Sequence, residues 1–133
     1  MFIIILIISF FIYNYIDEEV TNSSMMYVSV RHDIRNENIH YFDWYVENRS
    51  KKNESILTFK NGNILNYVIK CTNKNLKYES DKDHNFTVVL KKSEQYHTTV
   101  NLELTEKGHY IAKFWATSEE GTQGTMEIQF DIE

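Results

Sequence analysis

The sequence predicts an all-β fold of antiparallel strands packed as a sandwich. Between positions 100 and 132, apolar residues recur at every second position in three runs, 100–104, 110–116 and 126–132. Such alternation is typical of half-buried strands. Short polar turns with glycine join the runs, and connections of this length favour antiparallel neighbours. After the apolar N-terminus, no stretch has the apolar spacing of a helix longer than one turn.

The first 16 residues predict a signal peptide or a short N-terminal anchor. Residues 2–12 are apolar except for Ser9, and acidic residues begin at Asp17. A bilayer-spanning helix needs about twenty apolar residues, so this shorter run suits a secretory signal. A basic start and a small-residue cleavage site are both missing, which leaves an uncleaved anchor as the alternative. We therefore expect one domain over residues 17–133, secreted or on the extracellular face of a membrane.

Sequons and the single cysteine agree with that compartment. The chain carries four Asn-X-Ser/Thr sequons, at Asn22, Asn48, Asn53 and Asn85, which predict an N-glycosylated surface. Cys71 has no partner within the chain. Its apolar neighbours favour a buried thiol over an intermolecular bridge.

The remaining strands follow from alternation, taken in chain order. Residues 16–20 supply a ragged first strand, residues 26–30 a half-buried one, and residues 33–38 a polar separator. In the run 39–47, Phe42, Trp44 and Val46 face inward. Residues 48–54 read as a polar hairpin and 72–85 as a surface loop. The other expected strands are 56–59 paired with 64–69, then 86–90 and 98–102.

Two features resemble a variable-type immunoglobulin domain. The first is the layout of a tyrosine corner, formed by Leu102, Glu106, Gly108 and Tyr110. The second is Trp44, which would be the tryptophan buried on strand C. Val30 and Ala112 stand where such domains place their core cysteines, so the sandwich would lack a disulfide. In this respect it is similar to the first domains of SLAM-type lymphocyte adhesion receptors.

A fibronectin type III module is the alternative, because it also lacks cysteines and has a tyrosine motif like 104–116. The interval of 66 residues between Trp44 and Tyr110 and the absence of proline favour the variable type. The fold class expected is thus an immunoglobulin-like antiparallel β-sandwich, V-type, without a core disulfide.

The resemblance implies a glycoprotein that binds a host cell-surface or soluble protein through the outer face of its GFCC′ sheet, in adhesion or immune modulation. A composition rich in Ile, Asn, Lys and Tyr indicates an AT-rich genome, which suits a virus-encoded mimic. Exposed Tyr45 and Trp115 would anchor the partner, as aromatic hot spots do. Charged residues would steer and select it, namely Asp43, Glu47, Lys113 and Glu127. The second hypothesis is a self-associating structural glycoprotein, a homodimer through Cys71 or edge strands.

No enzyme class finds support in the sequence. There is no phosphate-binding glycine loop, nucleophile elbow or zinc-ligand spacing, and each of the five histidines is expected on the surface. A formal net charge of −5 argues against a nucleic-acid partner. We therefore expect no cofactor, no metal and no small-molecule substrate, and contact with a membrane only through an uncleaved N-terminus.

Overall fold

Every element in the computed structural model of the chain is a β-strand, over the residues that it describes, 25–61, 64, 66–81 and 85–133. The all-β prediction is confirmed. Among those residues, no helix is long and apolar enough to cross a membrane. The signal segment 1–16, the strand 16–20 and Asn22 lie outside the described residues. The strands are β1 (Met26–Arg35), β2 (Ile39–Asn48), β3 (Ile56–Phe59), β4 (Asn66–Cys71), β5 (Leu76–Glu79), β6 (Val88–Lys91), β7 (Gln95–Glu103), β8 (Gly108–Thr117) and β9 (Gln123–Ile132).

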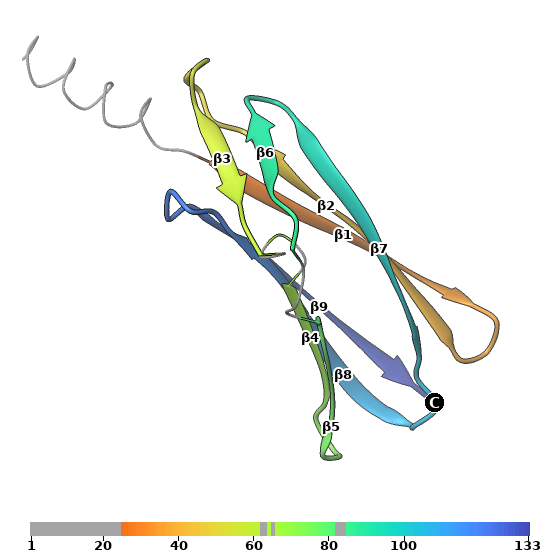
Figure 1. Ribbon diagram of the computed structural model, residues 1–133. Helices are drawn as coiled ribbons and strands as arrows, with labels where there is room; N and C mark the ends of the chain where they lie inside the picture. The colour runs from red at the N-terminus through yellow and green to blue at the C-terminus, as the bar shows by residue number, and fades with distance from the viewer. Residues whose placement is uncertain (1–24, 62–63, 65, 82–84) are drawn as a thin grey trace, which may run out of the picture.

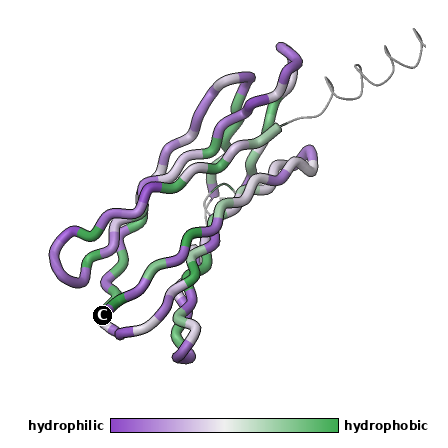
Figure 2. The backbone as a smooth tube through the Cα atoms, turned by 180° about the vertical axis from the view of Figure 1, so that it is seen from behind, coloured by the Kyte–Doolittle hydropathy of each residue, from purple (hydrophilic) through white to green (hydrophobic). Residues whose placement is uncertain are grey.

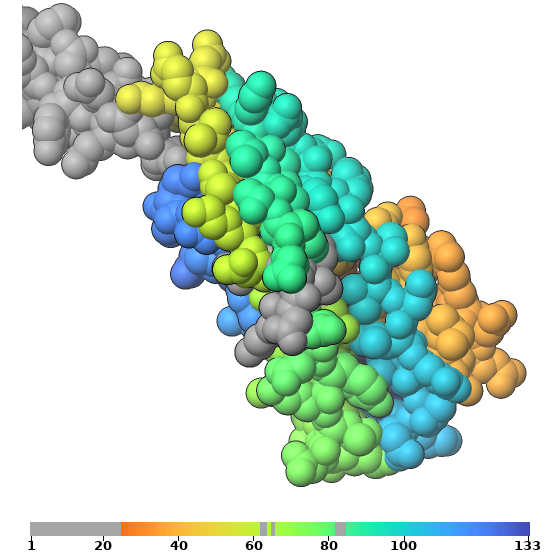
Figure 3. Space-filling view, viewed as in Figure 1, coloured from red at the N-terminus to blue at the C-terminus, as the bar shows by residue number. Residues whose placement is uncertain are grey.

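The strands form antiparallel sheets in two layers (Figure 1). One layer has the order β1-β2-β7, and the other has the order β5-β4-β8-β9. A two-stranded sheet of β3 and β6 lies beside β7, and the space-filling view shows it covering the upper part of the molecule (Figure 3). An apolar core fills the space between the layers.

Alternation along β2 and β8 builds the centre of this core. Trp44 on β2 is 1% exposed, and its indole lies 5.7 Å from the ring of Phe114 on β8. Phe42 packs against the same ring at 5.5 Å. Hydrophobic and hydrophilic residues alternate along the strands, and the loop tips are hydrophilic (Figure 2). Burial of such aromatic side chains is the main stabilising contribution in a sandwich without a disulfide.

The tyrosine corner forms as predicted. The hydroxyl of Tyr110 donates a hydrogen bond of 2.7 Å to the backbone oxygen of Glu106. Burial is the main cause that raises the pKa of Tyr110 to about 12, so the hydroxyl keeps its proton at neutral pH. This bond closes the turn between β7 and β8, which belong to different sheets.

The predicted sheet membership of the tryptophan strand is wrong. β2 pairs with β1 and β7, not with β8, and Val30 lies directly opposite Trp44. The cause is the segment expected as a polar separator, because β1 continues to Arg35 and only the turn at residues 36–38 separates it from β2. Asn36 has a positive φ of 60°, which asparagine tolerates in tight turns. A hairpin this tight holds both strands in one sheet.

Two other expectations in the middle of the chain are also wrong. Strand β3 pairs with β6 and strand β4 pairs with β5 and β8, so 56–59 and 64–69 are not partners. The expected loop 72–85 contains β5, which forms a hairpin with β4. Leu76 and Tyr78 of β5 pack against the core, and this burial explains why a charged, asparagine-rich segment still supplies a strand.

Candidate functional faces

The structure divides the six predicted partner-binding residues between the two sheets. Asp43, Tyr45 and Glu47 lie on β2, whereas Lys113 and Trp115 lie on β8 and Glu127 on β9. The residues on β2 and β8 alternate with buried residues, and Glu127 lies directly opposite Lys113, so all six side chains point outward. The expectation of one shared face is wrong, because the outer faces of two packed sheets point in opposite directions.

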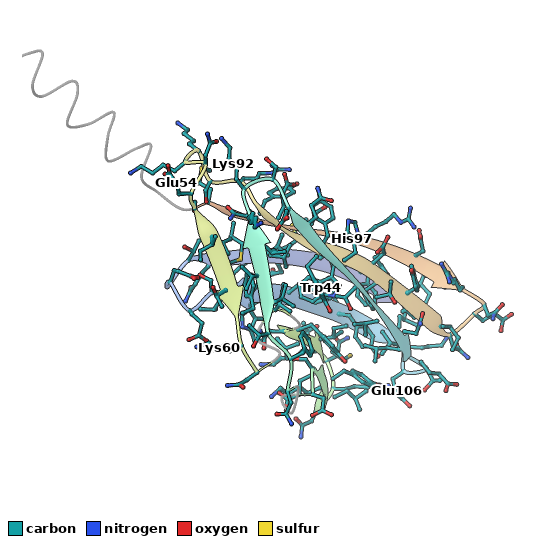
Figure 4. The ribbon with its side chains drawn as sticks, turned by 45° about the horizontal axis from the view of Figure 1, so that its top comes forward. Trp44, Glu54, Lys60, Lys92, His97 and Glu106 are labelled. Carbon is teal, nitrogen blue, oxygen red and sulfur yellow. The ribbon has the colours of Figure 1, made fainter. Side chains whose placement is uncertain are left out.

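The outer face of the β1-β2-β7 sheet is rich in tyrosine and arginine, and we call it the Tyr/Arg face. Its tyrosine, arginine and histidine members are Tyr27, Arg31, Arg35, Tyr41, Tyr45, Arg49 and His97. These include every arginine of the chain, and none of the three strands contains a lysine, although the chain has eleven. Arg49 follows directly after β2, and Figure 4 labels His97 on β7.

One continuous group of contacts crosses this face. The guanidinium of Arg49 lies 3.6 Å from the centre of the Tyr27 ring. That ring is 6.0 Å from Tyr45, which stacks on His97 at 5.1 Å. Glu47 pairs with Arg49 at 3.2 Å and accepts a hydrogen bond of the same length from the side chain of Gln95. These contacts restrict rotamers before any partner binds, which lowers the entropy cost of association.

A second group of contacts lies toward the β1–β2 turn. Arg31 pairs with Asp33 at 3.2 Å and with Asp43 at 3.8 Å. The guanidinium of Arg35 lies 3.7 Å from the centre of the Tyr41 ring. The Tyr/Arg face therefore carries charges of both signs, held in place by aromatic rings.

The outer face of the β5-β4-β8-β9 sheet is different in composition, and we call it the Trp115 face. It carries two shallow hollows, of about 320 Å³ and 490 Å³, that share Val68 and Lys113. Trp115 lines the smaller hollow and is half-buried. The outward residues that line the hollows on β4, β8 and β9 are Val68, Lys70, Ile111, Lys113, Trp115, Thr117, Gln123, Thr125 and Glu127.

His32 and His40 lie between the two sheets. His40 was expected on the surface, but it is buried. Nε2 of His32 and Nδ1 of His40 are 2.9 Å apart, and the His32 ring stacks on Phe42 at 4.6 Å. Phe130 of β9 covers the pair from the opposite sheet, 4.4 Å from His32. Burial lowers the pKa of both imidazoles. In the described part of the chain, no group of three or more His, Cys, Asp or Glu could hold a metal.

The sequons differ in what the fold allows. Asn48 is completely buried, and its Nδ2 donates to the backbone oxygens of Leu90 at 2.9 Å and Ser55 at 3.2 Å. A glycan at Asn48 does not fit this fold, because a glycosylated Nδ2 would be forced into the core. Asn53 and Asn85 are exposed. Asn53 lies in the loop at the end of the molecule where Figure 4 labels Glu54 and Lys92, and its Oδ1 accepts from Lys92.

Cys71 is buried, as expected, and this weakens the hypothesis of a dimer linked through its thiol. Gly108 lies over the sulfur, where a Cβ would stand 2.7 Å from Sγ. Elsewhere in the core, Nε1 of Trp44 is buried and has no hydrogen-bond partner in the part of the chain that the structure describes. A cavity of about 220 Å³ adjoins Trp44 and is lined by Tyr67, Ser80 and residues 98–100, among others.

The Tyr/Arg face is the feature that sequence reasoning missed, although a signal existed. The arginines occupy positions 31, 35 and 49, within one short part of a lysine-rich chain. Arg31 and Arg35 are also in phase with Tyr27, which alternation places opposite the inward Val28 and Val30. The strand pairing that adds Tyr45 and His97 could not be read locally.

The comparisons with known proteins concern the fold alone. No protein-family model matches the sequence, and a search of curated proteins gives no match. A β-glucosidase from Kluyveromyces marxianus is similar over 83% of this chain, with 13% identity and a TM-score of 0.50, and the chain spans only 14% of it. A β-glucosidase from Erythrobacter marinus has a TM-score of 0.49, at 11% identity over 81% of this chain and 15% of its own. The ApaA protein from Bordetella pertussis has a TM-score of 0.46, at 12% identity over 83% of this chain and 92% of its own.

Proposed function

We propose that this chain is an extracellular protein-binding domain, and that its interface is the Tyr/Arg face. The observation that carries the proposal is the segregation of every arginine, with three tyrosines, onto one lysine-free sheet face. Protein interfaces are enriched in Tyr and Arg and depleted in Lys relative to the rest of a surface. Hot-spot residues are drawn largely from the same two types and from Trp.

We further propose that the sandwich is immunoglobulin-like, in the fibronectin type III arrangement. Support comes from the tyrosine corner at Tyr110 and from the strand order. In that arrangement a three-stranded sheet faces a four-stranded one and carries the tryptophan on its second strand. Here the sheet β1-β2-β7 faces β5-β4-β8-β9, and Trp44 lies on β2. It suits the variable type less well, since there the tryptophan strand neighbours the tyrosine strand.

The partner on this proposal is a host cell-surface or soluble protein, and the biological role is adhesion or immune modulation by a secreted or surface glycoprotein. Tyr45 and Arg49 would be the anchors, because both are half-exposed or exposed and both are positioned by neighbours on the face. Asp43 and Glu47 would steer the partner, and their pairing with arginines suits a partner surface that also mixes both charges.

The test is binding of a fluorescent tetramer of the domain to lymphocytes and to a panel of other cells. A Tyr45→Ala, Arg49→Ala double variant should reduce binding at least about thirtyfold, because the truncation of a single hot-spot residue already costs about 2 kcal/mol or more. The matched control is a Val89→Ala, Lys91→Ala double variant on β6, whose two side chains are exposed and belong to neither face, and it should bind as the wild type does. Thermal melting of both variants verifies that they are folded.

Wild-type binding by the folded Tyr45, Arg49 variant would contradict the proposal. Loss of binding in the control variant alone would move the interface to the β3-β6 sheet. Measuring the molecular mass of the protein in solution, with and without reductant, tests the alternative of self-association. A non-covalent dimer that the Tyr45→Ala, Arg49→Ala variant no longer forms would mean that the partner is a second copy of the chain.

A further inference from the structure

The Trp115 face has hydrogen-bonding groups that the proposed protein interface does not use. Lys113 and Trp115 make no hydrogen bond or ion pair through their side chains with any other residue that the structure describes. Glu127, directly opposite Lys113 on β9, forms no ion pair with it. The ammonium group and the indole N–H are therefore available to a ligand.

The smaller hollow combines an aromatic wall with neutral polar groups. Trp115 lies near the end of β8, in register with Thr125 on β9, and Thr117 follows it on the same outer side of β8. Gln123 completes the polar lining. Among the residues that the structure describes, the lining thus offers an indole, one amide, two hydroxyls and the Lys113 ammonium, and no carboxylate.

The larger hollow continues the smaller one along β8. Both share Val68 and Lys113, and the larger adds Ile111, Lys70 and Glu127. Ile111 and Trp115 are four residues apart on one strand, which corresponds to about 13 Å at about 3.3 Å per residue. The two hollows together form an elongated site with a second apolar contact at its far end.

We propose that this site binds an oligosaccharide chain laid along β8. A pyranose ring has a C–H face that packs on an indole and a rim of hydroxyls that both donate and accept hydrogen bonds. The lining of the Trp115 hollow matches both requirements, and the elongated form suits a chain of several sugars. A protein partner fits less well, because a stable interface buries about 800 Å² per partner, whereas concave sites of some hundreds of Å³ suit small ligands.

Charge narrows the ligand class. Lys113 stands between the two hollows, Lys70 lies in the larger one, and Glu127 is the one acid in the combined lining. The site therefore accepts a neutral chain, and it also accepts one with an acidic group over the Trp115 hollow, where only Lys113 is charged. A chain with a cationic amino sugar over Trp115 would be rejected by the ammonium of Lys113.

The experiment titrates the glycosylation-free domain with cellotriose, maltotriose, mannotriose, chitotriose and sialyllactose at millimolar concentrations. The chain has two tryptophans, and Trp44 is 1% exposed, so a ligand-dependent change of fluorescence reports on Trp115. At least one of these probes should give a saturable change. Saturation-transfer NMR then measures the variants, in which Trp115→Ala should weaken binding at least about tenfold and Trp115→Tyr should retain most of it.

Tyr45→Ala on the Tyr/Arg face is the matched control and should bind the sugar as the wild type does, whatever its effect on a protein partner. A wild-type domain that binds none of the five probes would overturn the proposal. So would a folded Trp115→Ala variant with unchanged affinity, since it would place the sugar elsewhere. Because no residue is common to the two faces, failure here leaves the proposed protein interface untouched, and the reverse also holds.

Discussion

Replacing Asn48 with alanine should destabilise the domain more than any other sequon change. Its side chain makes three hydrogen bonds at the point where β2 ends. Nδ2 donates to Leu90 on β6 and to Ser55 before β3, and Oδ1 accepts from the backbone N–H of Ser50 at 3.0 Å. One amide therefore ties the β1-β2-β7 sheet to the β3-β6 pair.

The magnitude follows from what truncation leaves behind. A net contribution of about 1 kcal/mol per hydrogen bond gives about 3 kcal/mol for the three. The two carbonyls and the N–H would also lose their hydrogen bonds to Asn48, whose side chain is completely buried, so water does not replace these bonds without rearrangement. For a domain of this size, a loss of about 3 kcal/mol lowers the melting temperature by roughly 10–15 °C.

Asn48→Asp separates hydrogen bonding from simple packing. The carboxylate keeps the acceptor for Ser50 but has no donor for Leu90 and Ser55, and it would place a negative charge against two carbonyl oxygens. We therefore expect Asp to destabilise more than Ala at neutral pH, and less so as acid protonates the carboxyl group.

Urea denaturation followed by far-ultraviolet circular dichroism, with thermal melts, measures both variants. Asn53→Ala removes a sequon at an exposed position and should change the free energy of unfolding by less than about 0.5 kcal/mol. An Asn48→Ala protein as stable as the wild type would refute the reasoning. So would an Asn48→Asp protein more stable than the alanine variant at neutral pH.

Two further outcomes concern stability. His32 and His40 have folded pKa values below the ordinary 6.5, so the neutral pair contributes stability that is present above that pH and is lost as pH falls through the folded values. Urea titrations from about pH 7 to pH 5 should show this loss, and a His32→Phe, His40→Phe variant, which keeps the aromatic stack, should lack most of it. An equally steep dependence in that variant would exclude the pair as its source. Tyr110→Phe removes the hydroxyl that donates to Glu106 and should cost about 1–2 kcal/mol, and an unchanged urea midpoint would mean that the tyrosine corner contributes nothing.

Local patterns predicted which way side chains point, but not which strands are neighbours. Alternation gave the correct inward side for Trp44 and Tyr110 because the period of two is a property of each strand alone. It left the sheet undetermined, since an inward tryptophan is equally buried in either layer. The decisive feature was the turn at Asn36, because its tightness makes β1 and β2 a hairpin.

The same rule contained the answer for Asn48. Positions 42, 44, 46 and 48 are in phase, so alternation places Asn48 inward with the core aromatics. The sequon suggested an exposed side chain instead. In the structure the Asn48 side chain is buried, as the alternation predicts. By contrast, the hydrogen-bond acceptor from Leu90 on β6 lies 42 residues further along the chain, and no local pattern reveals it.

Because the two outer faces belong to different sheets, their ligands would be held on opposite sides of the sandwich. Arg49 follows β2 in one layer, Trp115 lies on β8 in the other, and the core lies between the layers. Substitutions at separated sites with no shared partner have additive effects. A protein partner on the Tyr/Arg face and a sugar chain on the Trp115 face should therefore bind without affecting each other. Simultaneous binding would let this small domain connect a protein to a glycan. We expect the affinity for each ligand to be the same in the ternary complex as when that ligand binds alone.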